Sequence, residues 1–196
     1  MVEQVGSDEA GIFTHGKALL SELIAHDDWL PHAFAQPSNE SYRQYLLYCD
    51  PLERFSVVSF VWAPGQTTPV HDHNVWGMVG VLRGAERCEE YELETETSGL
   101  RASGSHELPV GSVDLVLPDI GDIHRVSNAL AEGVSVSIHV YGANIGAVRR
   151  HIYDLDTGIK KPFISGYSNK VSRKWVAIQL AHRRMILPVF GAISGS

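Results

Sequence analysis

The chain has little of what defines several common classes of protein. Its 196 residues include two cysteines, Cys49 and Cys88, and no CxxC pair, so a disulfide framework is excluded. No apolar run approaches the ~18 residues of a membrane span. Acidic residues stand near the amino terminus, where a secretion signal would be basic and then apolar. We therefore expect a soluble, reduced, cytoplasmic protein with no membrane partner.

Basic clusters are also scarce. The formal net charge is −7, and Lys and Arg gather only in the C-terminal segment, residues 169–196. This balance argues against nucleic acid as the main partner. A hydrophobic content of 44% in 196 residues is typical of one domain with a well-filled core. We expect a monomer or small homo-oligomer whose partner is a small molecule.

Short β-rich runs separated by turn residues dominate the chain from residue 55 onward. They are "FSVVSFVWAPG", "WGMVGVLRG", "AERCEEYELET", "SVDLVLP", "GVSVSIHVYG" and "RRHIYDLDTG". This pattern predicts an all-β sandwich or barrel. Before it, leucines at three- and four-residue spacings in residues 14–35 predict an amphipathic helix broken near Pro31. Residues 39–51 predict a capped helix or a passage from helix to strand.

These patterns divide the chain into three parts. Residues 1–50 form an N-terminal helical segment packed on the barrel, and residues 51–168 form the barrel. Residues 169–196 are a tail that is basic and apolar without clean periodicity. This composition is compatible with a packed terminal strand, a loose tail or a segment that binds a partner.

Two histidines one residue apart stand in the run "PVHDHNVWG". On a strand, alternate side chains share a face, so His71 and His73 point the same way and Asp72 points the opposite way. An HxH pair alone is equally compatible with a polar surface strand. Gly65 before it and Gly84 after it complete a pattern that resembles the first cupin motif.

A second run resembles the second cupin motif. It passes from Gly111 through Pro118 to His124 and Asn128, with one extra residue on each side of the proline. The resemblance implies an all-β cupin barrel, a double-stranded β-helix of jelly-roll type, with N-terminal helices. It also implies a metal held by His71, His73 and His124. Gly77 stands where most cupins place a glutamate ligand. Five other histidines lack ligand spacing and are expected at the surface or as capping residues: His15, His26, His32, His106 and His182.

A polar triad follows in "SVSIHVYG". Ser137, His139 and Tyr141 alternate along one expected strand and so face the same side. Ordinary β alternation would explain this strand if it stood alone. Joined to three histidines and no glutamate, it resembles the cupin thiol dioxygenases of the cysteine dioxygenase family. The match is closest to the bacterial glutamine-type branch, the 3-mercaptopropionate dioxygenases, and it covers roughly residues 40–168.

That resemblance implies Fe(II) as cofactor and O2 as co-substrate, with both oxygen atoms added to the sulfur of a small thiol. Ser137 and His139 would orient the hydroxyl of Tyr141 beside the iron. Arg150 would pair with a substrate carboxylate, with Arg149 as its rival. The position occupied by arginine in mammalian-type enzymes aligns with Gln44, or one residue away with Arg43. Gln44 would offer a neutral amide on the side opposite Arg150.

Trp76 is expected to pack beside the site and contact substrate. Other readings stay open: a cysteine dioxygenase, an isomerase or hydrolase using zinc, nickel or manganese, or a small-molecule-binding cupin with a structural ion. Imidazole suits zinc, copper, iron and nickel alike, so the residue types do not select the metal. Iron is what the family resemblance implies.

Overall fold

The structure is a computed structural model that describes residues 9–94, 99–118 and 122–169. Its elements follow in chain order: α2 (Glu9–Ile24), the 3-10 helix η1 (His32–Phe34), β1 (Arg43–Cys49), β2 (Ser56–Trp62), β3 (Val70–His71), β4 (Gly77–Arg83), β5 (Ala85–Leu93), β6 (Leu100–Pro109), β7 (Val113–Val116), β8 (His124–Asn128), β9 (Ser135–Tyr141), η2 (Ile145–Ala147), β10 (Arg150–Tyr153) and β11 (Lys160–Phe163).

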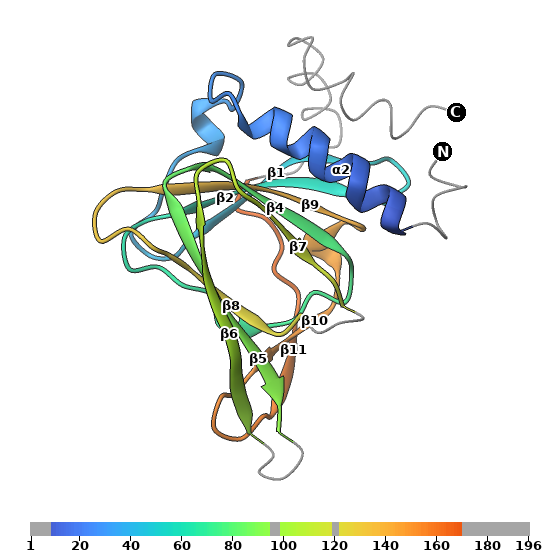
Figure 1. Ribbon diagram of the computed structural model, residues 1–196, viewed down its shortest axis with the longest axis vertical. Helices are drawn as coiled ribbons and strands as arrows, with labels where there is room; N and C mark the ends of the chain where they lie inside the picture. Colours follow the sequence, from blue (N-terminus) through green and yellow to red (C-terminus); the bar gives the residue numbers. More distant parts are fainter. Residues whose placement is uncertain (1–8, 95–98, 119–121, 170–196) are drawn as a thin grey trace.

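Two antiparallel sheets make up the barrel. One has the strand order β1-β2-β9-β4-β7, and the other has the order β11-β10-β3-β8-β5-β6. The sheets face each other, and α2 lies across the outer side of the five-stranded sheet (Figure 1). The β5–β6 hairpin extends from the opposite end of the molecule. The predicted all-β barrel is confirmed, and the described residues contain one α-helix, α2, where N-terminal helices were expected.

The N-terminal half of the prediction needs correction at residues 39–51. This segment contains neither a helix nor a passage out of one, because residues 43–49 form strand β1. β1 pairs antiparallel with β2, placing Gln44 opposite Phe60. The barrel therefore begins inside the segment that was assigned to the helical part. The tyrosines and leucines of this run are compatible with either structure, and pairing with the buried β2 decides for the strand.

The predicted helix also ends earlier than Pro31. α2 ends at Ile24, and the indole N–H of Trp29 donates to the carbonyl of Leu23 at 2.9 Å. The last carbonyls of a helix lack intrahelical donors, so this buried indole supplies one of the missing partners. Proline therefore does not set the helix end; a returning tryptophan side chain caps it.

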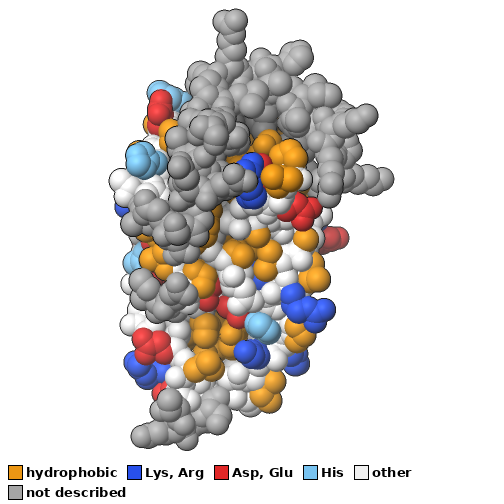
Figure 2. Space-filling view, turned by 90° about the vertical axis from the view of Figure 1, so that its right-hand side faces the viewer, with side chains coloured by type: hydrophobic (Ala, Val, Ile, Leu, Met, Phe, Trp, Pro, Cys, Tyr) orange, Lys and Arg blue, Asp and Glu red, His pale blue; other side chains and the backbone are white. Residues whose placement is uncertain are grey.

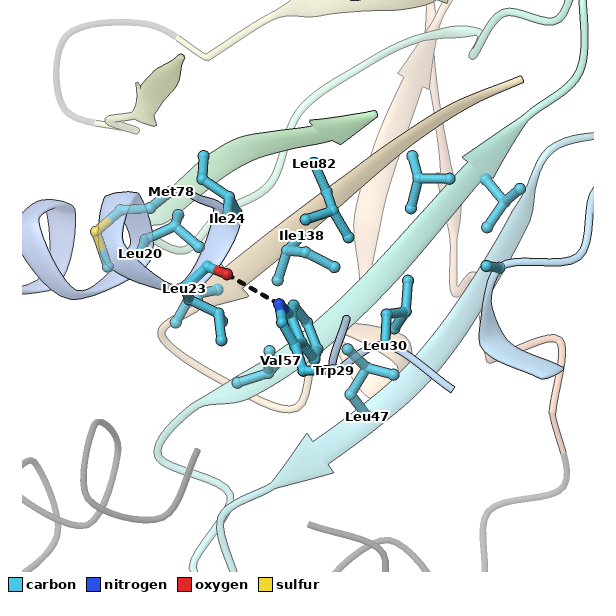
Figure 3. Close-up of a cluster of buried hydrophobic side chains, with 14 of the residues drawn as sticks. Leu20, Leu23, Ile24, Trp29, Leu30, Leu47, Val57, Met78, Leu82 and Ile138 are labelled. Atoms are coloured by element: carbon cyan, nitrogen blue, oxygen red, sulfur yellow. Dashed lines mark hydrogen bonds between the residues drawn. The ribbon is translucent and has the colours of Figure 1, made fainter. Parts of the chain in front are cut away.

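The main apolar core lies between α2 and the five-stranded sheet. Leu20, Leu23 and Ile24 of the helix face Val57, Met78 and Ile138 of the sheet in Figure 3. Gly80 of β4 allows the close approach, because a Cβ there would stand 3.0 Å from Leu20 Cγ and Ile24 Cδ1. A second cluster, which includes Val58, Trp62 and Val126, fills part of the barrel interior.

Strand β9 separates these two environments. Every residue from Ser135 to Tyr141 is buried. Val136, Ile138 and Val140 belong to the cluster under α2, while Tyr141 belongs to the interior cluster. Because successive side chains alternate between the faces of a sheet, Ser137, His139 and Tyr141 all face the barrel interior, as predicted.

The molecular surface mixes side-chain types. On the described part of the face in Figure 2, basic, acidic and apolar side chains are interspersed. Within the described residues, no helix is both long and apolar enough for a membrane span. Residues 170–196, which hold nearly all of the predicted tail, lie outside the described residues. Its first residue, Asn169, hydrogen-bonds the backbone of Leu46 in β1.

Removing apolar volume under α2 should destabilise the barrel measurably. Leu20 is 1% exposed, and Leu20→Ala should lower the free energy of unfolding by about 2–5 kcal/mol, because the cavity that it leaves cannot fully collapse. Urea unfolding followed by far-UV circular dichroism measures this loss. Lys17→Ala, on the exposed side of the same helix, is the matched control and should change stability by less than about 0.5 kcal/mol. Equal losses in the two variants would contradict this account of the core.

Candidate metal centre

Three histidines converge inside the barrel. β3 pairs with β8 so that His71 lies directly opposite His124, and His73 follows two residues after His71. The three ring centroids are 4.8–4.9 Å apart. One ligand nitrogen from each ring lies within 4.8 Å of the others. The structure therefore brings together the three residues that the sequence predicts as metal ligands.

Contacts behind the rings hold them in place. Nδ1 of His71 bonds the carbonyl of Pro69 at 3.0 Å, which makes Nδ1 the protonated nitrogen and leaves Nε2 as a lone-pair donor. Nδ1 of His124 lies 3.5 Å from the sulfur of Cys88. Nδ1 of His73 lies 3.5 Å from a carboxylate oxygen of Asp122 and has no hydrogen-bond partner among the described residues.

Burial keeps these imidazoles neutral. It lowers the pKa of His71 and His73 well below the usual value, with mutual repulsion as a smaller cause. Burial likewise lowers the pKa of His124 to about 3. Three neutral imidazoles whose lone pairs converge are a donor set suited to a divalent transition metal. The residues present therefore fit a bound metal ion.

Asp72 points away from this group, as the alternation along the strand predicts. Its carboxylate accepts from the backbone N–H of His151 at 2.7 Å, from the ring of His151 at 2.9 Å and from the hydroxyl of Tyr153 at 2.8 Å. These bonds fasten β3 to β10. Asn74, which has a φ of 58°, adds a side-chain bond to the carbonyl of Arg149. The histidine strand and the start of β10 are thus tied together.

Gly77 stands where the cupin motif predicts a glutamate ligand. The structure shows which side chain fills the volume that this glutamate would occupy. A Cβ at this position would lie 2.8 Å from Cδ1 and 2.9 Å from Cε1 of Tyr141. The tyrosine ring therefore fills the volume into which a side chain at position 77 would project. A glutamate at position 77 would therefore clash with the Tyr141 ring in its present conformation.

The triad on β9 forms a continuous chain of hydrogen bonds. Ser137 Oγ lies 2.8 Å from Nε2 of His139, and Nδ1 of His139 lies 2.8 Å from the hydroxyl of Tyr141. The ring of Tyr141 stacks on His73, with centroids 5.5 Å apart. The hydroxyl end of the triad thus adjoins the histidine group. Burial lowers the pKa of His139 to about 3 and raises that of Tyr141, so both groups are neutral at pH 7.

A cavity of about 520 Å³ contains the histidines, the inner part of the triad and two predicted substrate residues. Arg150 is 4% exposed and Gln44 is 6% exposed, and both line this cavity. Arg150 donates to the hydroxyl of Ser165 at 2.8 Å, and Gln44 donates to the same hydroxyl at 3.3 Å. Gln44 therefore does not lie opposite Arg150, which corrects the prediction, because β1 and β10 both meet the segment that contains Ser165.

The sequence left two choices open, between Arg149 and Arg150 and between Arg43 and Gln44, and the structure gives the members of each pair different surroundings. Arg149 is exposed, whereas its neighbour Arg150 is buried in the cavity. Arg43 contacts Ser38 and Glu40 near the surface. Arg150 and Gln44 are both buried and line the cavity, whereas Arg43, which also lines it, is partly exposed.

Trp76 does not join the cavity. Its ring meets Phe13 of α2 edge-on at 6.0 Å, and it is absent from the residues that line the cavity. Trp76 and Met78 share the strand face toward the helix, while Gly77 between them faces the interior. This corrects the prediction that Trp76 contacts substrate. Trp62, on β2, lines the cavity instead.

Three further features near the site are not marked by the sequence motifs. Ser165 links Gln44 and Arg150, and no local pattern marks it. Glu86, on β5, is fully buried beside the triad, and the alternation of "AERCEEYELET" is the signal that could have found it. Cys88, Glu90 and His106 form a second group with ligand atoms within 4.8 Å of one another. His106 therefore does belong to a possible metal-binding group, although it is partly exposed.

No family model matches the chain, but several solved structures are similar to it. A double-stranded β-helix protein from Klebsiella pneumoniae is 19% identical, covers 62% of this chain and 95% of its own, and superposes with a TM-score of 0.45. A cupin 2 conserved barrel domain protein from Salinispora arenicola is 19% identical over 61% and 89% of the two chains, with a TM-score of 0.42. An oxalate oxidase is 16% identical over 63% and 62%, with a TM-score of 0.46.

The chain has a cupin-like fold. Two antiparallel sheets enclose the histidine group, and one N-terminal helix covers the outer face of the five-stranded sheet. The fold and the buried triad of histidines are consistent with a metalloenzyme.

The metal centre can be tested without assuming a reaction. The protein should bind one divalent ion per chain, and His73→Ala should remove most of the bound metal, because two imidazoles remain from a set of three. Metal content after loading with Fe(II) or Co(II) and gel filtration measures this. His26→Ala, at an exposed histidine, is the matched control and should retain the metal. Full occupancy in His73→Ala would show that the ion lies elsewhere.

Proposed function

We propose that this protein is a mononuclear iron(II) thiol dioxygenase that converts a small thiol carboxylate to its sulfinate, with 3-mercaptopropionate as the favoured substrate. The observation that carries the proposal is a buried arginine, without an ion pair among the described residues, in the same cavity as three neutral histidines. An anionic ligand that also offers a thiolate would satisfy both groups at once.

Arg150 is poised for such an anion. Burial lowers its pKa, and its guanidinium lies over the ring of Phe163 at 4.7 Å. Its Nε has no hydrogen-bond partner, and no ion pair among the described residues includes it. A buried charge is costly unless it is paired, so the site favours a ligand that brings a carboxylate. The planar guanidinium matches the two oxygens of that group.

The histidines would hold the iron. When bound, iron(II) supplies the redox chemistry by which both atoms of O2 are added to the substrate sulfur, giving R–SO2H from R–SH and O2. The absence of a carboxylate at position 77 leaves the ligand set without negative charge, which favours a thiolate from the substrate. Arg150 and the three histidines line the same cavity, so one small substrate could place its sulfur at the metal and its carboxylate at Arg150.

Tyr141 would act on the reacting end of the substrate. Its raised pKa keeps the hydroxyl protonated, so the group can donate a hydrogen bond into the cavity. His139, which is neutral and bonded on both ring nitrogens, fixes the position of that hydroxyl. Phe60 packs against the His139 ring at 4.2 Å and restricts its rotation.

Substrate choice follows from the charge of the cavity. A substrate without an amine places its thiolate at the metal and its carboxylate at Arg150. Cysteine adds an ammonium group, which Arg150 repels, and cysteamine lacks the carboxylate altogether. Gln44 and Ser165 beside Arg150 add neutral hydrogen-bonding groups and no negative charge. We also propose a cytoplasmic location, in keeping with the free thiols of Cys49 and Cys88.

The ranking of thiols tests this proposal. For the iron-loaded protein, kcat/KM should be highest for 3-mercaptopropionate, lower for cysteine and lowest for cysteamine. Arg150→Ala should lower kcat/KM for the first two by at least about tenfold, because a charge-assisted pair in a buried site is worth about 2–5 kcal/mol. Oxygen consumption and sulfinate formation measure both effects.

Arg149→Ala provides the matched control, since that side chain is exposed and adjacent in sequence. It should leave the ranking unchanged. A parent protein that prefers cysteine would favour a cysteine dioxygenase. Thiol binding without oxygen consumption would favour a non-dioxygenase metal-binding cupin.

Removing one hydroxyl should separate catalysis from metal binding. Tyr141→Phe keeps the ring that stacks on His73 and loses the donor, so iron content should stay at the parent level while kcat falls at least about tenfold. Tyr91→Phe, on β5 and beside Arg125, is the control and should retain the parent kcat. Iron analysis and steady-state kinetics decide the question. A parent-like kcat in Tyr141→Phe would reduce the triad to a packing role.

A further inference from the structure

Cys88, Glu90 and His106 form a cluster of three different donor side chains on β5 and β6. Cys88 and Glu90 are alternate residues of β5 and share a face, and His106 of β6 pairs directly with Cys88. One possible ligand atom from each side chain lies within 4.8 Å of the others. Thiolate sulfur, imidazole nitrogen and carboxylate oxygen are the three donor types that bind zinc in proteins. The cluster therefore offers a zinc ion one ligand of each type.

Asp114 orients the imidazole of this cluster. A carboxylate oxygen of Asp114 lies 2.9 Å from Nε2 of His106, while Nδ1 of the same ring lies 3.6 Å from a carboxylate oxygen of Glu90. The bond to Asp114 places an N–H on Nε2, so in the neutral ring Nδ1 carries the lone pair on the side of Glu90. Histidines that bind metals commonly donate their other N–H to a carboxylate in this way. Asp114 belongs to β7, so both sheets contribute to the arrangement.

The carboxylates of the cluster have no Lys or Arg beside them. Among the described residues, Glu90 and Asp114 form ion pairs only with the ring of His106. Glu89, which neighbours Glu90 on the opposite face of β5, instead pairs with Arg125 at 2.8 Å. Two carboxylates that share one imidazole leave negative charge uncompensated, and a divalent cation between them would balance it.

The cluster has space for the carboxylate and a path from solvent. Gly104 of β6 lies opposite Glu90, and a Cβ at that glycine would lie 2.5 Å from Oε2 of Glu90. The carboxylate thus uses space that any other residue at position 104 would fill. Glu90 and His106 are partly exposed, whereas Cys88 is 3% exposed. A cation can therefore enter past the two outer ligands and reach the sulfur at the inner end.

We propose that Cys88, Glu90 and His106 bind an exchangeable zinc ion, with Asp114 as the residue that positions His106. This site is separate from the proposed reaction and does not depend on it. It adjoins the histidine group without sharing a ligand, because the sulfur of Cys88 lies 3.5 Å from Nδ1 of His124. Sulfur, nitrogen and oxygen donors around a tetrahedral zinc lie about 3.4–3.6 Å apart, so small side-chain rotations would complete the geometry.

The ion should exchange with the solution. Water can replace the two outer ligands, because both are partly exposed, and the thiol must release its proton to solvent before sulfur binds. We therefore expect this ion to be removed by gel filtration, unlike an ion held by the three buried histidines. Its binding is measured at equilibrium, in the presence of free metal.

Cobalt(II) distinguishes this site from the histidine group, because only a thiolate ligand gives a sulfur-to-cobalt charge-transfer band in the near ultraviolet. The full-length protein is titrated with Co²⁺ in buffer without added thiol, and absorbance is recorded. We expect the band to appear and then to vanish when Zn²⁺ is added, since zinc binds such ligands more tightly than cobalt. Absence of the band throughout the titration would overturn the proposal.

Two cysteine variants locate the thiolate. Cys88→Ser should abolish the band, and Cys49→Ser, which removes the other thiol of the chain, should retain it. Far-UV circular dichroism confirms that Cys88→Ser is folded, because this residue is buried. A band that persists in Cys88→Ser would overturn the proposal.

The outer ligands can be changed without disturbing the core. Glu90→Gln and His106→Gln should each raise the Kd for Co²⁺ at least about tenfold. Asp114→Asn should raise it about tenfold while the band keeps its parent wavelength, because the thiolate stays bound and the amide polarises the imidazole less. Glu89→Gln, at the adjacent carboxylate on the opposite face, is the matched control and should keep the parent Kd. A parent-like Kd in both Glu90→Gln and His106→Gln would overturn the assignment of these ligands.

Discussion

Burial of β9 on both faces is the constraint on which the rest of the structure depends. Its valines and isoleucine pack under α2, and its serines, histidine and tyrosine face the interior. A shift of register by one residue would place Ser137 and His139 in the apolar core and the apolar residues in the cavity. The core beneath α2 therefore fixes the orientation of the triad. The packing of β9 therefore contributes both to the stability of the fold and to the geometry of the site.

In the six-stranded sheet, the histidines are positioned by a short strand that pairs with a neighbour on each side. β3 is only two residues long, yet it is held on both sides, by β8 at His124 and by β10 at Ile152. Asp72 reinforces the second contact with bonds to His151 and Tyr153. A carboxylate that faces away from the histidine group thus helps to position the start of β10, where Arg150 enters the cavity.

Within the part of the chain that the structure describes, the buried polar atoms that lack hydrogen-bond partners gather around the cavity and the triad. Among the described residues, the buried polar atoms without partners are Nε1 of Trp62, Nδ1 of His73, Oε2 of Glu86 and Nε of Arg150. Each belongs to a residue of the cavity or to the carboxyl behind the triad. Unpaired buried polar groups cost free energy, and proteins tolerate them chiefly at functional sites. Because these atoms lie together, they support the interpretation of this cavity as the functional site.

The sequence by itself determined the strands and the faces of the site. Alternation along "SVSIHVYG" and "PVHDHNVWG" placed the triad and the histidine pair inward and Asp72 outward, because side-chain direction in a strand has a fixed period of two. The same local rule would have placed Trp76 on the face shared with Met78 and Glu86 on the inward face of its strand, although neither was predicted.

Tertiary structure alone decided how distant segments meet. β1 became a strand because β2 pairs with it, and α2 ended at Ile24 because Trp29 returns to cap it. Gln44 and Arg150 stand together because Ser165, which is 121 residues from Gln44 and 15 from Arg150, accepts a hydrogen bond from both. Hydrogen bonds between segments more than a hundred residues apart leave no periodic trace in the sequence. Their partners are selected by the packing of whole strands, which no local pattern encodes.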